Sequence, residues 1–397
     1  MNILILVDCY LPSTKASAKL IHDLACEFYH QGYTVTVVAP DDKLSANVLV
    51  TNEQGVRIVR FKTGKIKTAS RFVRALNEMR LSSLLWKRGK SFFLKNCFDV
   101  IVYYTPSIFW GSIVKRLKDL YNCHSYLILR DIFPQWAVDA GILNEGIIYR
   151  YFKWKETQNY NAADIIGVQS PANLLYFEEN GTDGKYQLEV LYNWATLQEY
   201  NIPSENHRER LGLQGKVVFF YGGNIGIAQD MDNIIRLANN LRDESSAYFL
   251  LVGDGSEVSR LRDDIKSKGL TNIALHEAVE QQEYLSMLSE FDVGLISIAR
   301  GLRTQNFPGK MLGYMYCSMP ILASINPGND LKTILELQQA GLVCINGDDE
   351  RFAENAITLL ENKDLRHRLG NNAHFLLKDK FSVSNAAKQI MSHFDPR

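Results

Sequence analysis

The 397-residue sequence lacks several features that would identify its class directly. No apolar run reaches the roughly 18 residues that a membrane-spanning helix needs, so we expect any membrane contact to be peripheral. The six cysteines form no C-x-x-C pair and have no histidines at zinc-ligand spacing, which is typical of reduced thiols in a cytosolic protein. The 44 basic and 44 acidic residues cancel, which argues against a nucleic-acid-binding protein. The eight histidines form no cluster, so no histidine-based hydrolase site is predicted.

The chain instead shows a regular alternation of short apolar segments and longer segments of helical period. This pattern is typical of parallel βαβ units, and the length favours two domains. A polar segment from Ala195 to Gly215 interrupts the alternation and is the predicted linker. We therefore predict an α/β fold of two doubly wound, Rossmann-like domains facing across a cleft. The predicted domains span 1–197 and 198–380, and a C-terminal helix within 381–397 is expected to pack back on the first domain.

The predicted strands and helices follow from these segments. The strands are 2–7, 34–39, 56–61, 99–104, 125–130 and 164–169 in the first half, and 216–221, 247–252, 272–275, 291–297 and 320–323 in the second. The longer predicted helices include 15–31, 68–95, 107–121, 146–161, 171–180, 230–241, 256–268, 281–289 and 309–317.

Residues 62–98 carry a strong local excess of positive charge. Ten Lys or Arg residues and a single acid, Glu78, are interleaved with Trp86 and other apolar residues. A helix with one basic and one apolar face suits adsorption to an anionic membrane leaflet, which is our prediction for this arm. The alternatives are a core helix with a solvated charged face and, less favoured, a nucleic-acid patch. We expect a cytoplasmic protein that lies peripherally on the inner face of a membrane.

Four predicted strands of the second half end in loops that carry glycine, polar or basic residues. Because the carboxyl ends of parallel strands meet at one edge of a sheet, these loops together predict a nucleotide phosphate site. Their spacing is not G-x-G-x-x-G, which disfavours a nicotinamide cofactor. The candidate donor-binding residues are Gly223, Asn224, Gly253, Asp254, Gly255, His276, Glu277, Gln305, Pro308 and Gly309.

The fourth of these loops also holds the candidate catalytic cations. Pro308 suits an early helix position, so the N–H groups of residues 309–311 are expected to point toward a ligand. Lys310 and Arg303 would add positive charge where a pyrophosphate leaving group gains negative charge. The alternative is a basic loop on the surface.

Two aspartates follow strands of the first half. Asp131 is the candidate residue for binding the donor sugar or an acceptor hydroxyl. The alternative is a structural aspartate at the start of a helix. Asp8, at the end of the first strand, is a similar candidate on the acceptor side. Asp230-Met-Asp232 matches the D-x-D pattern, which binds a divalent metal in some enzymes. It lies at a predicted helix start, however, where aspartates cap free N–H groups. We therefore predict no metal and no other cofactor.

These segments resemble glycosyltransferase family 4, a retaining group with GT-B architecture, over nearly the whole chain. In the second half the resemblance rests on Tyr221-Gly-Gly-Asn-Ile-Gly226, Leu250-Leu-Val-Gly-Asp-Gly255 and Phe307-Pro-Gly-Lys-Met-Leu-Gly-Tyr-Met315. In the first half it rests on Leu129-Arg-Asp-Ile-Phe-Pro134, Ala163-Asp-Ile-Ile-Gly-Val-Gln-Ser170 and Val190-Leu-Tyr-Asn-Trp194. The Arg-Asp-Ile-Phe-Pro and Tyr-Asn-Trp segments are most similar to the subgroup that adds N-acetyl-L-fucosamine in bacterial O-antigen or capsule assembly.

The resemblance implies a metal-independent transferase with a UDP-linked amino sugar as donor and a sugar on undecaprenyl pyrophosphate as acceptor. The sequence departs from the family pattern at several positions. Gln305 and Gly313 stand where two glutamates are usual, Asn224 and Gln229 replace an Arg and a Lys, and Ala16-Ser17-Ala18 replaces a glycine pair. Ala16 and Ser17 are thus acceptor-side candidates. The other functions in view are a nucleotide-sugar 2-epimerase of the same architecture and a catalytically silent membrane-surface binding protein.

Overall fold

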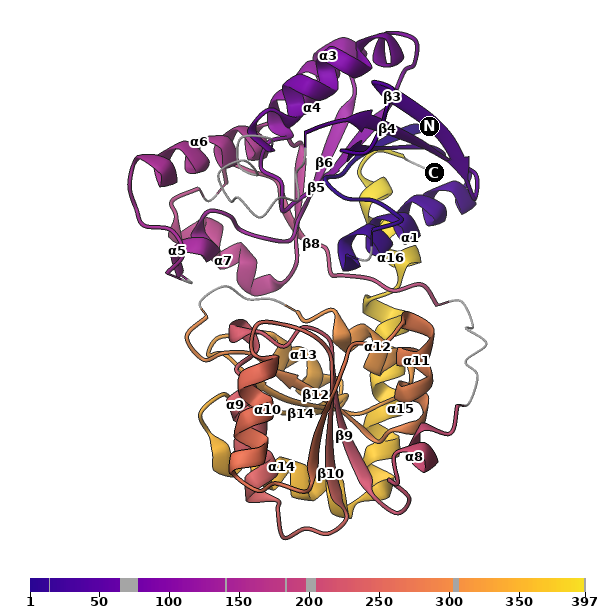
Figure 1. Ribbon diagram of the computed structural model, residues 1–397. Helices are drawn as coiled ribbons and strands as arrows, with labels where there is room; N and C mark the ends of the chain where they lie inside the picture. Colours follow the sequence, from indigo (N-terminus) through magenta and orange to yellow (C-terminus); the bar gives the residue numbers. More distant parts are fainter. Residues whose placement is uncertain are drawn as a thin grey trace. The chain divides into compact units, whose positions relative to one another are not determined.

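The computed structural model describes residues 1–13, 15–64, 78–139, 141–182, 184–197, 205–302 and 307–395. The chain divides into two compact units (Figure 1), each with its own sheet. Unit 1 comprises Met1–Thr196 and Val383–Arg397, and unit 2 comprises Leu197–Ser382. The first boundary falls one residue before the predicted one, and the C-terminal segment belongs to unit 1.

Unit 1 contains an eight-stranded sheet in the order β3-β4-β2-β1-β5-β6-β7-β8, parallel except for β3. The strands are β1 Asn2–Leu6, β2 Thr34–Asp41, β3 Val48–Glu53, β4 Val56–Lys62, β5 Val100–Tyr104, β6 His124–Leu129, β7 Ile165–Val168 and β8 Leu188–Val190. The described helices are α1 Ala16–His30, α3 Leu81–Leu94, α4 Gly111–Tyr121, α5 Gln135–Asp139, α6 Ile147–Asn161, α7 Pro171–Glu179 and α16 Val383–Ser392.

The central strand β1 shows why helices cover both faces of this sheet. Successive side chains of a strand point to opposite faces, and all of residues 3–6 are apolar. Ile3 and Ile5 enter a core cluster shared with α1 and α16. Leu4 and Leu6 enter a second cluster shared with α3, α4 and α7. The predicted doubly wound arrangement of this half is confirmed, and the C-terminal helix α16 packs against α1.

Two short strands of unit 1 are absent from the prediction. β3 forms an antiparallel hairpin with β4 at the edge of the sheet, joined through Gln54 and Gly55, which both have positive φ. Edge strands with exposed side chains lack the apolar runs that reveal buried strands, and β3 is mostly exposed. β8 has only three residues, all half-buried. Helix α4 begins four residues after its predicted start at 107.

The described part of the basic arm packs in part against the core of unit 1. Residues 65–77 lie outside the described structure, and α3 follows them. Leu81, Leu85 and Phe93 of α3 are fully buried in the second core cluster of unit 1. Trp86 stacks on Phe93 with ring centroids 6.5 Å apart. Leu81, Leu85 and Phe93 of α3 therefore belong to the core, whereas Leu94 of the same helix is exposed. That the arm contacts a membrane stays a prediction.

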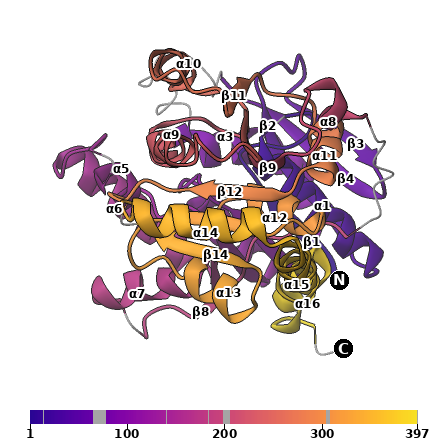
Figure 2. The same ribbon diagram turned by 90° about the horizontal axis from the view of Figure 1, so that it is seen from below.

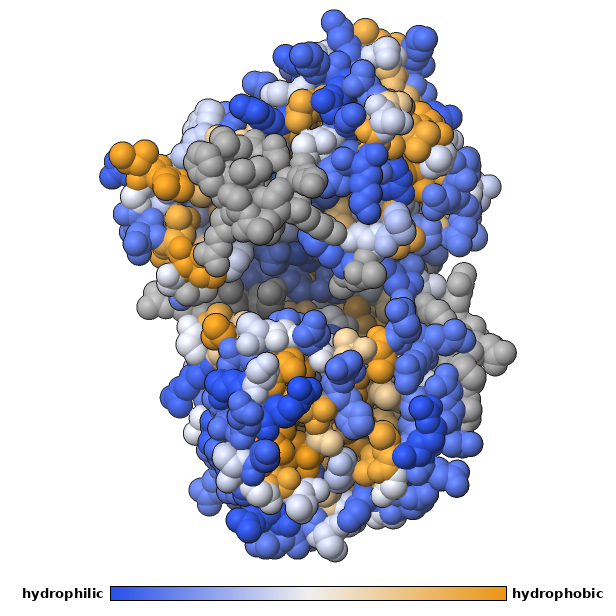
Figure 3. All heavy atoms as spheres, viewed as in Figure 1, coloured by the Kyte–Doolittle hydropathy of each residue, from blue (hydrophilic) through white to orange (hydrophobic). Residues whose placement is uncertain are grey.

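Helix α6 shows the opposite arrangement. Figure 3 shows apolar residues gathered on the surface at the end of unit 1 where Figure 1 draws α5 and α6. Ile147 and Trp154 of α6 are exposed, whereas Glu156 and Asn159 of the same helix are buried. Among the helices that the structure describes, none is both long and apolar enough to cross a membrane.

Unit 2 contains a six-stranded, fully parallel sheet in the order β11-β10-β9-β12-β13-β14. Helices α9, α10 and α14 cover one face, and α11, α12 and α15 cover the other (Figure 1); α14 runs along β14 in Figure 2. The strands are β9 Val217–Gly222, β10 Ala247–Val252, β11 Ile273–His276, β12 Val293–Ser297, β13 Ile321–Ile325 and β14 Gly341–Ile345. The helices are α8 His207–Arg210, α9 Met231–Asn240, α10 Val258–Ser267, α11 Gln281–Glu290, α12 Lys310–Tyr316, α13 Leu331–Leu337, α14 Asp349–Glu361 and α15 Lys363–Lys380, with a 3₁₀ turn at Ile227–Gln229.

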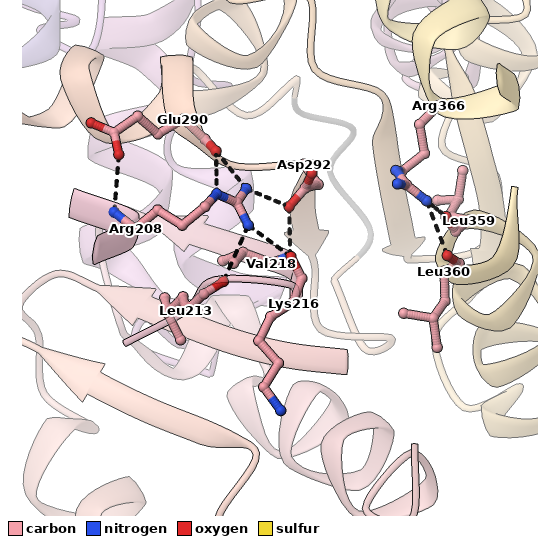
Figure 4. Close-up of polar contacts among 9 residues, drawn as sticks. All are labelled: Arg208, Leu213, Lys216, Val218, Glu290, Asp292, Leu359, Leu360 and Arg366. Atoms are coloured by element: carbon pink, nitrogen blue, oxygen red, sulfur yellow. Dashed lines mark hydrogen bonds and ion pairs between the residues drawn. The ribbon is translucent and has the colours of Figure 1, made fainter. Parts of the chain in front are cut away.

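Hydrogen bonds of Arg208 connect the start of unit 2 to the amino end of its sheet (Figure 4). Its guanidinium donates to the carbonyl oxygens of Glu290 (2.5 and 3.2 Å) and Lys216 (2.7 Å) and to the Asp292 carboxylate (2.8 Å). The same Asp292 oxygen accepts from the N–H of Val218 on β9 (2.8 Å). This network connects α8, β9 and the segment between α11 and β12. Figure 4 also shows Arg366, which donates to the last carbonyls of α14.

Candidate active site

The strand order of unit 2 reverses between β9 and β12, and ligands of such sheets bind at the carboxyl ends of the strands beside this switch point. β9 and β12 pair only at Val293↔Phe219 and Gly294↔Phe220. Where the pairing stops, the hydroxyl of buried Tyr314 accepts from the N–H of Gly222 and donates to the carbonyl of Leu295, both at 3.2 Å. Tyr314 thereby bridges the two strands, a role that the sequence did not reveal.

The loops after β9 and β10 cross in close backbone contact. A Cβ at Gly253 would lie 1.9 Å from the Gly223 carbonyl oxygen, and one at Gly255 would lie 2.1 Å from that of Ile225. The N–H of Ile225 donates to the carbonyl of Asp254 at 2.9 Å. These glycines are therefore required for the packing of the two loops. Asp254 uses its carboxylate locally, to accept from the N–H of Gly255 at 2.7 Å.

Asn224 and Gln229 are bonded to each other. The Asn224 amide donates to the Gln229 side-chain oxygen at 2.8 Å, and the N–H of Gly226 reaches the same oxygen at 3.2 Å. A Cβ at Gly226 would lie 2.9 Å from the Asn224 amide nitrogen. Asn224 and Gln229, which stand where the family that the sequence resembles has an Arg and a Lys, thus hold the loop after β9 together by uncharged hydrogen bonds.

Lys310 brings positive charge to this loop. Its ammonium lies over the ring of buried Tyr221, 3.2 Å from the centroid. A Cβ at Gly223, which has φ of 118°, would lie 3.8 Å from Lys310 Nζ. Burial lowers the pKa of the Lys310 ammonium well below its ordinary value. Lys310 and Gly223, predicted from separate loops, therefore meet at the carboxyl edge of the unit 2 sheet.

The helix start at Lys310 differs in part from the prediction. α12 begins at Lys310 after Gly309, close to the predicted start. The N–H of Met311, however, donates to the carbonyl of Pro308 at 3.0 Å, so it is not available to a ligand as predicted. Arg303 and Gln305 lie outside the described residues.

Tyr284 occupies the space beside Gly313. A Cβ at Gly313 would lie 3.5 Å from the Tyr284 ring and 3.8 Å from its hydroxyl. The same ring packs on Gly222, where a Cβ would lie 2.3 Å from it. The nearest atom to the Cβ at Gly313 is Leu288 Cδ1, at 3.1 Å, so a side chain at position 313 would meet Leu288 before the Tyr284 ring. Tyr284 is a candidate ligand-facing residue that sequence reasoning missed, because it lies on α11 outside every loop motif.

His276 and Glu277 follow β11, one strand away from β10. The carbonyl of His276 accepts from the N–H of Gly253 at 3.1 Å, so its backbone supports the glycine loop. Glu277 is exposed and His276 is half-buried. The structure thus connects His276 to the other predicted donor-binding residues through the backbone.

The D-x-D triplet has other partners than a metal or the helix N–H groups. Asp230 adopts a left-handed conformation, and its side chain makes no cap, so the predicted capping role is wrong. Its carboxylate instead accepts from buried Asn346 at 2.9 Å. Asp232 forms an ion pair with Arg260 at 2.8 Å. The two aspartates are thereby engaged in structural contacts.

One group of possible metal ligands occurs in the described part of the chain. The side chains of Glu205, His207 and Glu283 place their ligand atoms within 4.8 Å of one another. His207 Nε2 lies 3.4 Å from the Glu205 carboxylate, and Arg210 lies 3.6 Å from the same group. The contacts of Glu205 are thus ion pairs within the protein, and these residues belong to none of the four loops of the carboxyl edge.

In unit 1 the two candidate carboxylates lie close enough to interact. Asp131 follows β6 and Asp8 follows β1, and β5 lies between these strands. Burial and the nearby Asp8 carboxylate raise the pKa of Asp131, whereas Arg130 lowers it. The N–H of Asp131 donates to the Thr105 hydroxyl at 3.4 Å. The structure therefore brings Asp8 and Asp131 together at the carboxyl edge of unit 1.

Arg130 anchors the loop that carries Asp131. Its guanidinium donates to the carbonyl oxygens of Leu191 (2.7 Å) and Tyr192 (3.2 Å). It also lies over the Trp194 ring, 5.3 Å from the centroid. The two segments that the sequence singled out, around Arg130 and around Trp194, thus pack on each other. Ala16 and Ser17 open α1.

Part of the chain is similar in sequence to known proteins. Residues 203–374 match the family model described as Glycosyl transferases group 1. The chain is 26% identical over 232 residues to "Probable glycosyltransferase WbjE" of Pseudomonas aeruginosa, covering 57% of each protein. It is 22% identical over 259 residues to a protein of Escherichia coli (strain K12) named as a colanic acid biosynthesis glycosyl transferase, WcaI, covering 62% of each. The matches thus span about three fifths of these relatives' length.

The structure of Anabaena HepE in complex with UDP is similar over 99% of each chain, with a TM-score of 0.71 and 15% identity. This similarity shows the fold, which confirms the predicted GT-B class. The family match covers most of unit 2, and the two relatives are named as glycosyltransferases.

Proposed function

We propose that the protein is a glycosyltransferase of polysaccharide biosynthesis that transfers a sugar from a nucleoside diphosphate held by unit 2. The observation that carries the proposal is the Lys310 ammonium beside Gly223, at the switch point of a parallel sheet. A partly dehydrated ammonium attracts a diphosphate strongly, because the charge is poorly screened there. The glycine loops allow the phosphates to approach the backbone closely.

The reaction that we propose retains the anomeric configuration and needs no metal. The bond from the sugar C1 to the diphosphate oxygen breaks, and a bond from C1 to the acceptor oxygen forms on the same face. The departing phosphate oxygen takes the acceptor's proton. Lys310 stabilises the negative charge that develops on the diphosphate, and Asp131 orients a hydroxyl of the donor or acceptor.

The finer assignment rests on the resemblance of the first-half motifs and on similar proteins. We propose UDP as the nucleotide, because HepE, which shares the fold, is seen with UDP and with UDP-glucose. The colanic acid designation of WcaI supports a role in surface polysaccharide assembly. The Arg130-Asp-Ile-Phe-Pro134 and Tyr192-Asn-Trp194 segments favour N-acetyl-L-fucosamine as the sugar and an undecaprenyl-pyrophosphate-linked sugar as the acceptor, at the cytoplasmic face of the membrane.

A product screen tests this function. The purified chain is incubated with UDP-, GDP- or dTDP-sugars and a lipid-linked acceptor analogue, and both the nucleotide and the lipid products are analysed. Release of UDP together with a new glycoside is expected. An epimerised nucleotide sugar without a glycoside would show a 2-epimerase instead, and UDP binding without turnover of any donor would favour a silent binding protein. The Lys266→Ala variant, which removes an exposed lysine of α10, serves as a folded control.

A further inference from the structure

The outer face of α6 consists of Ile147, Ile148, Tyr151 and Trp154. Ile147 is 87% exposed, Ile148 63% and Trp154 52%. At 100° per residue, Ile147, Tyr151 and Trp154 share one stripe of the helix, and Ile148 flanks it. Ile142, which is 61% exposed, extends the apolar surface into the preceding loop.

The inner face of α6 carries buried polar residues beside Tyr160, which belongs to the second core cluster of unit 1. Glu156 lies opposite Ile147 and is buried, where Lys153 pairs with it at 2.5 Å and Tyr160 donates to it at 3.0 Å. Asn159 is buried as well. A surface helix of a soluble domain normally faces the core with its apolar side. In α6 apolar side chains are exposed on the outer face as well, and a cluster of exposed apolar side chains marks a contact surface.

The charges of α6 indicate which partner covers this face. α6 contains three basic residues and one acid, and the acid is the buried Glu156. Arg150 is exposed beside the stripe, and the Lys155 ammonium lies 4.4 Å from the centroid of the Trp154 ring. Glu145, before the helix, offsets one of these charges. Apolar and aromatic side chains flanked by lysine and arginine suit insertion between anionic lipid headgroups.

Helix α6 packs on the loop that carries Asp131 through Phe152, which lies outside the outer face. Phe152 of α6 packs on Phe133, with ring centroids 5.1 Å apart, and Phe133 packs on Trp136 of α5 at 6.2 Å. Trp136 is itself 37% exposed. The surface and the candidate acceptor carboxylate therefore belong to one packed layer of unit 1.

We propose that the α6 outer face docks the protein on an anionic lipid surface. In this arrangement Ile147, Ile148 and Trp154 enter the headgroup region, and Arg150 and Lys155 contact lipid phosphates. The docking surface serves the proposed function, because a lipid-linked acceptor is then presented beside Asp131. Helix α6 exposes more of its apolar residues than α3, whose Leu81, Leu85 and Phe93 are buried.

Vesicle flotation of the full chain tests the proposal. Wild-type protein is expected to float with vesicles of phosphatidylcholine and phosphatidylglycerol, and less with added salt. Ile147→Glu with Ile148→Glu should lower the partition coefficient roughly 100-fold, since each buried isoleucine contributes about tenfold. The matched control is Leu337→Glu with Phe375→Glu, which changes two exposed apolar residues of unit 2 and should float like wild type.

Two readouts separate this proposal from its alternatives. Circular dichroism must show the same melting curve for the α6 variant and wild type; if it does not, Ile147→Ser with Ile148→Ser takes its place. Equal flotation of the folded α6 variant and wild type, or no flotation of wild type, overturns the proposal. If light scattering shows a wild-type dimer and a monomeric α6 variant, and wild type does not bind vesicles, the face binds a second copy of the chain instead. UDP affinity measured by calorimetry should be unchanged by the α6 variant, so failure of docking and failure of the glycosyltransferase proposal are distinguishable.

Discussion

Replacing Lys310 with Met should change stability and activity in opposite directions. The substitution keeps most of the side-chain volume over the Tyr221 ring and removes the ammonium. A cation over an aromatic ring contributes about 0.5–2 kcal/mol, which favours the charged form. The pKa of Lys310 is nevertheless lowered by burial, so the loss of hydration outweighs this attraction. We therefore expect the Lys310→Met variant to be more stable than wild type at pH 7.5.

The pH dependence checks the cause of this gain. A lysine whose pKa is lower in the folded state destabilises the protein fully below that folded pKa. The destabilisation disappears as the pH rises toward the unfolded value of about 10.4. The stability difference between Lys310→Met and wild type should therefore shrink in urea unfolding at pH 10.

Transfer should fall while stability rises. Loss of one transition-state charge stabiliser typically lowers turnover by about 10²–10³-fold, or roughly 2.7–4 kcal/mol. Lys266→Met, at an exposed position of α10, is the matched control and should change neither quantity. A Lys310→Met variant that is less stable than wild type at pH 7.5, or that transfers sugar at the wild-type rate, would refute the reasoning.

Three further predictions concern the network of Arg208, the carboxylate of Asp131 and metal dependence. Arg208→Ala should lower the free energy of unfolding by about 3 kcal/mol in urea titrations, because the Asp292 carboxylate and the Glu290 carbonyl lose their hydrogen-bond donor. The control Arg262→Ala, at an exposed position, should change the free energy of unfolding little. Asp131→Asn should stabilise the protein at neutral pH, because the raised pKa means that the charged carboxylate is unfavourable in the folded state. This gain should disappear below about pH 4, where the carboxyl is protonated in both the folded and the unfolded state. A pH-independent effect in thermal melts would mean that its charge is not the cause. Activity should persist in EDTA; loss that Mg²⁺ or Mn²⁺ restores would show that the transferase needs a metal.

The sequence predicts the buried part of the fold well, because parallel strands between two helical layers are continuous apolar runs. Ile3 to Leu6 illustrate this, since all four side chains are buried in one of two cores. β3 escapes prediction because an exposed edge strand has no such run. Helix α6 is predicted at 146–161, but the sequence does not show which of its faces is covered.

For the candidate site, the sequence indicates which loops meet but not how each side chain is used. Gly223, Gly253 and Lys310 are brought together as the strand-end rule predicts. The Asn224–Gln229 bond and the Tyr284 ring beside Gly313 depend on contacts between separate elements, which no local pattern encodes. For the basic arm, the sequence left open whether the apolar face of α3 meets a membrane or the core, and the structure places Leu81, Leu85 and Phe93 in the core.

The state of the Lys310 ammonium with and without UDP tests the central claim most directly. Nuclear magnetic resonance of protein labelled with ¹⁵N-lysine can follow this group, and the Lys310→Met variant assigns its signal. We predict a pKa below the ordinary lysine value in the free protein and a clear rise when UDP binds, because the diphosphate supplies the opposite charge that the free site lacks. UDP binding that leaves the pKa of Lys310 unchanged, or no UDP binding by the folded protein, would contradict the assignment of this edge as the donor diphosphate site.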